Sequence, residues 1–300
     1  MKELGRLITA MVTPFKDDGS IDFVQTRKLA KALVASGSDG IVVAGTTGES
    51  PTVTWEEEHA LFMAVKEAVG NKAKVIAGTG SNSTAEAVEN TIKAEKLGVD
   101  AALLVVPYYN KPTQEGLYRH FKAVADATRL PIILYNVPSR TVTSLSAEMT
   151  VRLSKIQNVV GIKEASGNLG EIARIIDGTQ SARPDFTVWS GNDSDTLPMM
   201  AIGAHGVISV ASHLVGLQIK RMMESFVAGK LAEAAALHRH LTPIFNDLFV
   251  VANPIPIKYA LNYIGFKVGP TRLPLTEPDE KTAAIIRDTL KLYHIDLPLG

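Results

Sequence analysis

The sequence predicts an α/β fold, a (β/α)8 TIM barrel with a C-terminal helical extension. Short apolar segments alternate with longer amphipathic segments eight times, and each alternation has the roughly 20–35 residues of a βαβ unit. The length of 300 residues also fits such a barrel with an extension. Connections of this type make strands parallel and bury both of their faces, which agrees with near-continuous apolar runs. An open, doubly wound sheet is the alternative fold.

Eight apolar runs predict the strands, which cover residues 6–12, 40–44, 74–78, 100–106, 131–136, 158–163, 186–190 and 206–210. Amphipathic segments predict the helices that follow them, at residues 22–36, 54–69, 83–97, 113–128, 146–156, 169–178 and 194–202. Asp22 is placed to cap the first helix. Two pairs have the spacing of capping boxes, Thr54 with Glu57 and Ser83 with Glu86.

The pattern changes after about residue 212, where strand-like runs cease. Helices are predicted there at residues 214–228, 231–251, 256–264 and 279–292. Pro254 and Pro256 mark a break and a helix start within this region. We therefore expect a catalytic barrel domain at residues 1–225 and a helical domain at residues 226–300.

Composition excludes several classes of function. Lys+Arg and Asp+Glu are both 31, so there is no basic surplus to favour nucleic acid or an anionic membrane. The chain has no cysteine, which excludes disulfides, thiolate ligands and a cysteine nucleophile and fits a reducing compartment. The N-terminus lacks a signal peptide's apolar core, and no apolar run reaches the ~18 residues of a membrane helix. A cytoplasmic location is expected.

Metal and nucleotide cofactors are not expected either. None of the seven histidines has a recognisable ligand spacing, and His238 and His240 face different ways on a helix. The run Gly78-Thr79-Gly80 lacks the third glycine of a dinucleotide fingerprint, and there is no Walker A motif.

The stretch from Asn158 to Asn168 carries the strongest chemical signal. It is a predicted buried strand that ends in Lys163, and because residues alternate faces along a strand, Lys163 shares its face with Gly161. Desolvation disfavours a charged ammonium, and a neutral lysine amine can attack a ketone to form a Schiff base. The alternative is a strand-end lysine that extends to water.

Other polar residues follow the predicted strands, at the end where active sites of such barrels lie. Thr46 and Thr47, flanked by glycines, offer hydroxyls and backbone N–H groups to a carboxylate. Tyr135 is expected beside Lys163, where a phenol can transfer protons. Arg140 offers a bidentate fork for a second carboxylate. The set describes a keto-acid lyase or synthase.

Each of these residues also has a structural interpretation. The Gly-Thr-Thr-Gly run could be an ordinary turn, and Tyr108 and Tyr109 could be interface aromatics. Tyr135 could be a core residue with a satisfied hydroxyl, and Arg140 could form a surface ion pair. Their shared location at one end of the predicted barrel favours the functional interpretation.

The sequence resembles the pyruvate-dependent class I aldolase family, which includes N-acetylneuraminate lyase. The resemblance covers essentially the whole chain. It is carried by Ala10-Met11-Val12-Thr13-Pro14-Phe15, Gly45-Thr46-Thr47-Gly48-Glu49-Ser50, Ile76-Ala77-Gly78-Thr79-Gly80, Pro107-Tyr108-Tyr109-Asn110-Lys111-Pro112, Tyr135-Asn136-Val137-Pro138-Ser139-Arg140, Gly161-Ile162-Lys163-Glu164-Ala165 and Asn253-Pro254-Ile255-Pro256-Ile257-Lys258. Within this family, the sequence resembles the branch that condenses pyruvate with L-aspartate 4-semialdehyde in lysine biosynthesis.

The resemblance implies a role for each site residue. Lys163 would form the Schiff base with pyruvate, and Thr47 would hold the pyruvate carboxylate. Tyr135, Thr46 and Tyr109 would form a proton relay, with Tyr109 reaching into a neighbouring subunit of a homotetramer, a dimer of dimers. Arg140 would bind the carboxylate of the aldehyde. The remaining pocket residues would be Gly191 and Ile208, the latter through its carbonyl.

The resemblance also implies an allosteric cleft for lysine at a dimer interface. The corresponding residues are Ser50, Pro51, Trp55, Glu58, Asn82, Glu86 and Tyr108. Sensitive bacterial members of the family tend to carry histidine at the position of Glu58, and often at that of Trp55. We therefore expect weak or absent feedback inhibition by lysine.

Two rival functions stay open at this point. One is a sister enzyme of the same scaffold, such as N-acetylneuraminate lyase, against which Arg140 argues because its fork suits a carboxylate better than a sugar chain. The other is a non-catalytic barrel that binds a keto acid, against which the complete lysine, tyrosine and threonine set argues.

Overall fold

The computed structural model describes residues 4–299 and contains a closed barrel of eight strands in chain order, β1 to β8. Every strand pair whose register is defined is parallel. The strands are β1 Leu7–Ala10, β2 Gly40–Val43, β3 Lys74–Gly78, β4 Ala101–Val105, β5 Ile132–Asn136, β6 Val159–Glu164, β7 Thr187–Ser190 and β8 Gly206–Ser209. The closed order confirms the predicted TIM barrel and excludes the open sheet.

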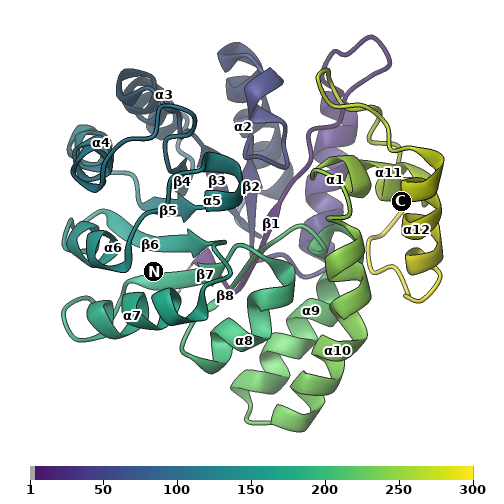
Figure 1. The fold of residues 1–300 in the computed structure, drawn as a ribbon. Coiled ribbons are helices and arrows are strands. Elements are labelled where there is room, and N and C mark those ends of the chain that lie inside the picture. The colour runs from purple at the N-terminus through teal and green to yellow at the C-terminus, as the bar shows by residue number, and fades with distance from the viewer. Residues whose placement is uncertain (1–3, 300) are drawn as a thin grey trace. The chain divides into compact units, whose positions relative to one another are not determined.

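Helices follow the strands as predicted (Figure 1). Those of the βα alternation are α1 Phe23–Ala35, α2 Trp55–Val69, α3 Thr84–Lys96, α4 Gln114–Ala127, α6 Ala147–Ser154, α7 Leu169–Gln180 and α8 Thr196–Ala201. Four more, α9 Ser212–Val227, α10 Leu231–Asp247, α11 Ile255–Tyr263 and α12 Glu280–Leu290, form the predicted helical extension. None of the helices in residues 4–299 combines the length and hydropathy required to span a bilayer.

Within the described residues, two short elements lie outside the predicted helices, because single turns carry too few residues to show a periodicity. They are the 3-10 helix η2 Ser50–Thr52 and the one-turn helix α5 Pro138–Thr141, and both lie in loops that follow strands of the barrel. The helix predicted at residues 194–202 is divided into the 3-10 helix η3 Asp193–Asp195 and α8.

The predicted helix starts are confirmed at two positions and corrected at a third. Asp22 caps α1 by accepting from the Gln25 backbone N–H, and Thr54 with Glu57 forms a complete capping box on α2. Ser83 does cap α3, but its own backbone N–H donates to the Ser81 hydroxyl. The Glu86 carboxylate accepts from that same hydroxyl, at 2.8 Å, so the reciprocal half of the predicted box is replaced by a serine bridge.

The chain packs as two compact units, which we describe separately. The first contains the residues through Arg6 together with Ile76–Ile208, and its helices α3, α4, α6 and α7 pack one after another outside strands β4 to β7 (Figure 1). The second contains Leu7–Val75 and the residues from Ser209 onward, and there α9 packs against α10, and α11 against α12. The predicted domain boundary after residue 225 falls within α9 and stays a prediction.

A cross-strand layer in the first unit determines where the key lysine lies. The register pairs Tyr135 of β5 with Lys163 of β6, and Lys163 with Trp189 of β7, so the three side chains share one face of the sheet. Gly161 lies two residues before Lys163 on that face. A Cβ at Gly161 would lie 2.3 Å from the Thr187 carbonyl oxygen and 2.7 Å from the Trp189 ring. Glycine is therefore required for β6 and β7 to pair at this separation.

We predict that Gly161→Ala lowers the free energy of unfolding by about 1–3 kcal/mol, because the added methyl group forces the two strands apart. Urea unfolding followed by circular dichroism measures the change. Gly170→Ala in α7 is the matched control, because its Cβ would meet only the Asn168 side chain, at 3.4 Å. Equal stability of the two variants would contradict the packing described for Gly161.

Candidate active site

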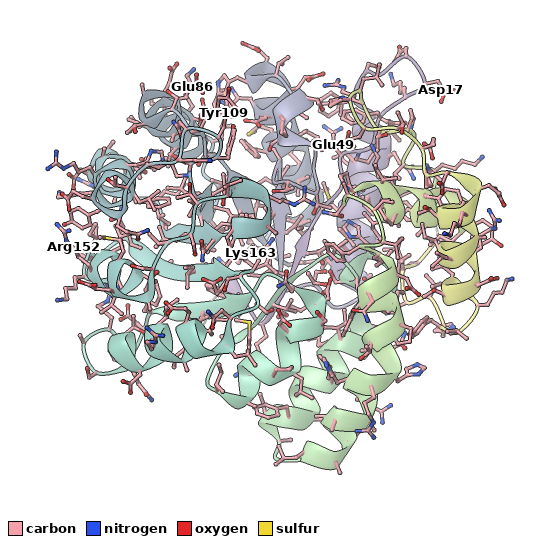
Figure 2. All side chains as sticks on the ribbon, viewed as in Figure 1. Asp17, Glu49, Glu86, Tyr109, Arg152 and Lys163 are labelled. Carbon is pink, nitrogen blue, oxygen red and sulfur yellow. The ribbon has the colours of Figure 1, made fainter. Side chains whose placement is uncertain are left out.

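Lys163 occupies the end of β6 and is buried, with 5% of its surface exposed (Figure 2). Its Nζ lies over the ring of Tyr135, 4.2 Å from the centroid, and Tyr135 is itself buried. The structure therefore excludes the alternative, in which Lys163 extends to water, and agrees with the predicted burial. Tyr135 contacts the amine through its ring face, a cation–π geometry available to an ammonium. Proton transfer by its hydroxyl stays a prediction.

Gly191 lies against the stem of Lys163. A Cβ at this position would be 3.2 Å from the Lys163 Cε and 2.6 Å from the Ala165 Cβ, so any larger residue would compete with the lysine for space. The Gly191 N–H donates to the Glu164 carbonyl oxygen at 2.7 Å, which fixes the loop after β7. The structure thus brings Lys163, Tyr135 and Gly191 together. Ile208 is fully buried in β8, and the role of its carbonyl stays a prediction.

A buried polar network supports the segment that follows β5. Asn136 donates through Nδ2 to both oxygens of the Glu164 carboxylate, at 2.9 and 3.2 Å, and accepts through Oδ1 from the Leu145 backbone N–H. Burial raises the pKa of Glu164, and the hydrogen bonds from Asn136 and Ser166 oppose that shift. The network ties both ends of residues 136–145 to the strand that carries Lys163.

Arg140 lies within this supported segment, on the single turn α5. Its side chain is exposed, so it is not part of the buried set around Lys163. Pro138 starts the turn with a backbone dihedral angle suited to a first helical position, and Val142 ends it in the left-handed region, with φ of 62°. The Arg140 guanidinium, which is predicted to bind a carboxylate, therefore lies on a short turn that hydrogen bonds hold at both ends.

Thr46 and Thr47 belong to the second unit, in the loop that follows β2. The loop is a tight turn, in which the Gly48 N–H donates to the Gly45 carbonyl oxygen and the Glu49 N–H to that of Thr46. Thr47 is 3% exposed, and its Oγ1 accepts from Asn253 Nδ2 at 2.9 Å. The loop is a turn, as the structural interpretation expected, and binding of a carboxylate there stays a prediction.

Glu49 in the same loop forms a buried ion pair with Lys258 of α11. The Lys258 Nζ lies 2.8 Å from Glu49 Oε1, and neither side chain is more than 2% exposed. The second oxygen, Oε2, accepts from the Arg272 backbone N–H at 2.9 Å. Burial lowers the pKa of Lys258, and the Glu49 carboxylate opposes that shift. Removing one partner of such a pair leaves an uncompensated buried charge.

Tyr108 and Tyr109 lie in the loop that follows β4, where Tyr109 is labelled in Figure 2. Tyr109 is 87% exposed and has φ of 73°, an uncommon backbone conformation for a non-glycine residue. Two hydrogen bonds hold the loop, from Asn110 Nδ2 to the Asn82 carbonyl oxygen and from Asn82 Nδ2 to that of Tyr108. The structure thus presents Tyr109 at the surface, away from the buried Lys163 set.

The residues of the predicted allosteric cleft are divided between the two units. Asn82, Glu86 and Tyr108 lie in the first unit, and Ser50, Pro51, Trp55 and Glu58 in the second. Glu58 differs from the rest, because it is buried in α2 and burial raises the pKa of its carboxyl to about 8. The Trp55 ring on the same helix packs edge-on against His59, with 4.1 Å between centroids. Lysine binding here stays a prediction.

Sequence reasoning assigned no role to the buried polar partners of these residues. Glu164, Lys258 and Asn253 were recognised only as members of motifs that carry the family resemblance. Lys258 had a usable signal, because it lies between apolar residues in a short helix. Its pairing with Glu49 and that of Asn253 with Thr47 had no signal, since the partners lie more than 200 residues apart along the chain.

Comparisons with known proteins show the family of the chain and agree with its barrel fold. A model of the dihydrodipicolinate synthetase family matches residues 3–292. The 4-hydroxy-tetrahydrodipicolinate synthase of Dehalococcoides mccartyi is 73% identical over 299 residues, covering 100% of both chains, and that of Moorella thermoacetica is 55% identical, covering 95% of this chain and 98% of the relative. A solved dihydrodipicolinate synthase from Cyanidioschyzon merolae with lysine bound matches with a TM-score of 0.94 and 50% identity, covering 96% and 98% of the two chains. The Bacillus anthracis enzyme matches with a TM-score of 0.95 and 46% identity, covering 98% and 100%.

The buried carboxyl of Glu58 predicts a pH dependence of stability. Its pKa is raised in the folded protein, so the folded state holds the proton more tightly than the unfolded state does. The free energy of unfolding should therefore fall as pH rises from about 4.5 to 8, by about 3–5 kcal/mol. Glu58→Gln, which keeps the shape and removes the titration, should abolish this fall.

Urea midpoints measured across that pH range provide the test. Glu56→Gln, which changes an exposed carboxylate on the same helix, is the control and should behave like the unmodified protein. A Glu58→Gln variant with an unchanged pH profile would show that Glu58 does not titrate as described.

Proposed function

The chain belongs to the dihydrodipicolinate synthetase family, and on this premise we propose that it condenses pyruvate with L-aspartate 4-semialdehyde to 4-hydroxy-tetrahydrodipicolinate. The enzyme would be a class I aldolase-type lyase of the diaminopimelate route of lysine biosynthesis. The observation that carries the proposal is the buried Lys163 amine beside Tyr135 at the end of a barrel strand. A cytoplasmic location stays a prediction.

The proposed reaction uses Lys163 as a nucleophile. Its neutral amine adds to the ketone carbon of pyruvate, and loss of water gives an iminium ion. Loss of a proton from the pyruvate methyl group gives an enamine, whose carbon attacks the aldehyde carbon of the second substrate. The amino group of that substrate then attacks the iminium carbon, which closes the ring and releases Lys163. One water is formed for each product.

The remaining residues would bind substrates and move protons. Tyr135, Thr46 and Tyr109 would carry protons during imine formation and aldehyde attack. Thr47 would hold the carboxylate of pyruvate, and Arg140 that of the aldehyde substrate. The carbonyl of Ile208 and the space left by Gly191 would complete the pocket around the adduct.

Self-association would complete the proton relay. Tyr109 is 87% exposed and is held outward by a hydrogen-bonded loop, which suits an aromatic side chain that inserts into a second copy of the chain. We therefore propose a homotetramer, a dimer of dimers, in which each Tyr109 serves the site of its neighbour.

The choice of substrate separates this proposal from a sister activity such as that of N-acetylneuraminate lyase. We predict that the purified protein turns over pyruvate with L-aspartate 4-semialdehyde, and that Lys163→Ala lowers kcat by at least about a thousandfold, since the covalent route is lost. Consumption of both substrates, followed by chromatography, measures turnover.

Lys155→Ala is a suitable control, because this lysine lies in the same unit, at the end of α6, and is exposed. It should leave turnover unchanged. Cleavage of N-acetylneuraminate without condensation of the aldehyde would contradict the proposed substrate. Full turnover by a folded Lys163→Ala variant would contradict the proposed nucleophile.

We also propose that lysine is a weak regulator of this enzyme. A buried Glu58 carboxyl with a pKa of about 8 is mostly neutral at pH 7, so it offers little charge to the ammonium of a lysine ligand. We predict that sub-millimolar lysine leaves the steady-state rate essentially unchanged, and that Glu58→His increases inhibition. Strong inhibition of the unmodified enzyme in that range would contradict the proposal.

A further inference from the structure

The Thr47 hydroxyl has a buried hydrogen-bond donor from a distant part of the same unit. Asn253 lies between α10 and α11, is 5% exposed, and donates through Nδ2 to Thr47 Oγ1 at 2.9 Å. Thr47 is itself 3% exposed, so the pair is formed away from bulk water. A buried polar contact across 206 positions of the sequence needs a physical reason beyond local turn formation.

The direction of this hydrogen bond determines where the Thr47 proton can point. A hydroxyl has one proton and two acceptor lone pairs, whereas an amide NH2 group can only donate. When Asn253 donates to Oγ1, the hydroxyl proton is left to point at another acceptor. A carboxylate is acceptor-only, so a threonine prepared in this way matches it.

Two further contacts fix the position of the Thr47 loop, and one of them also links that loop to the helix next to Asn253. Lys258, on the helix that begins just after Asn253, is paired with Glu49 of the Thr47 loop at 2.8 Å. On the other side of the loop, the Thr13 hydroxyl donates to the Gly48 carbonyl oxygen at 2.6 Å. A Cβ at Gly48 would lie 3.1–3.2 Å from the Ala44 backbone and the Met11 carbonyl oxygen, so the loop also has little room to shift.

We propose that Asn253 is a positioning residue that sets the Thr47 hydroxyl as a hydrogen-bond donor to the pyruvate carboxylate, with the Glu49–Lys258 ion pair holding both in place. This inference rests on the proposed function. In this scheme the helical C-terminal region does not contact pyruvate. It influences pyruvate binding only through the hydrogen bond from Asn253 to Thr47.

Asn253→Asp tests the direction of the hydrogen bond. The aspartate has the same shape, and its ionised form is acceptor-only, so it draws the Thr47 proton toward itself and away from the substrate. We expect the KM for pyruvate to rise at least about tenfold. The KM for the aldehyde and the kcat at saturating pyruvate should change little, because the loss concerns ground-state binding.

Asn253→Ala distinguishes positioning from packing. Alanine removes the donor but leaves the Thr47 hydroxyl free to rotate, so its effect on the KM for pyruvate should be smaller than that of aspartate. A purely structural role predicts the reverse order, because alanine leaves a cavity and aspartate does not. Thr13→Val is the matched control, since it removes a hydrogen bond to the same loop without touching the Thr47 hydroxyl.

A double-mutant cycle completes the test. In a Thr47→Val background, where no hydroxyl remains to be oriented, either change at Asn253 should have little further effect on the KM for pyruvate. If Asn253→Asp does not fold, Asn253→Ala alone decides, because the rise that it causes in the KM for pyruvate must still vanish in the Thr47→Val background. An undiminished effect there, or an alanine effect equal to or larger than that of aspartate, would overturn the inference.

Turnover of the unmodified enzyme separates this inference from the proposed function. If the unmodified protein condenses pyruvate with the aldehyde and the expected pattern is missing, only the role of Asn253 is wrong. If the unmodified protein shows no turnover with these substrates, the proposed function is wrong, and the inference falls with it.

Discussion

The burial of one amine is the constraint on which the proposed site depends. Lysine is almost never fully buried unless it is paired, yet Lys163 is 5% exposed and lies over an aromatic ring. Space for it exists because Gly191 leaves room for its stem, while Gly161 leaves room for the Trp189 ring on the same face. The residues around Lys163 therefore accommodate a group that packing alone would exclude, which is typical of functional sites.

A second buried lysine, Lys258, has a different environment and a different consequence. It is paired with Glu49, which also accepts a backbone hydrogen bond, so its charge is compensated. Buried pairs of this kind add little net stability compared with apolar residues, but they fix one arrangement because separating them is costly. This contrast supports the proposed roles, in which Lys163 reacts with pyruvate and Lys258 stabilises the loop that contains Thr47.

Much of the architecture could be predicted because each strand is a continuous apolar run and each long helix is amphipathic. The position of Lys163 followed from strand parity, and its burial agreed with that argument. The short helix α5, on which Arg140 lies, could not be predicted, because a single turn has no periodicity. The capping box predicted at Ser83 does not form, because the Ser81 hydroxyl binds both the Ser83 backbone N–H and the Glu86 carboxylate. The Asn253–Thr47 contact was also out of reach, since it depends on how distant segments fold together.

The central claim is that the Lys163 amine forms a covalent imine with pyruvate. The most direct measurement is to incubate the folded protein with pyruvate and sodium borohydride, digest it, and locate the reduced adduct by peptide mass spectrometry. The account predicts one reduced pyruvate per chain, on the peptide that contains Lys163 and on no other lysine. An adduct on a different lysine, or none under conditions in which the enzyme turns over, would contradict it.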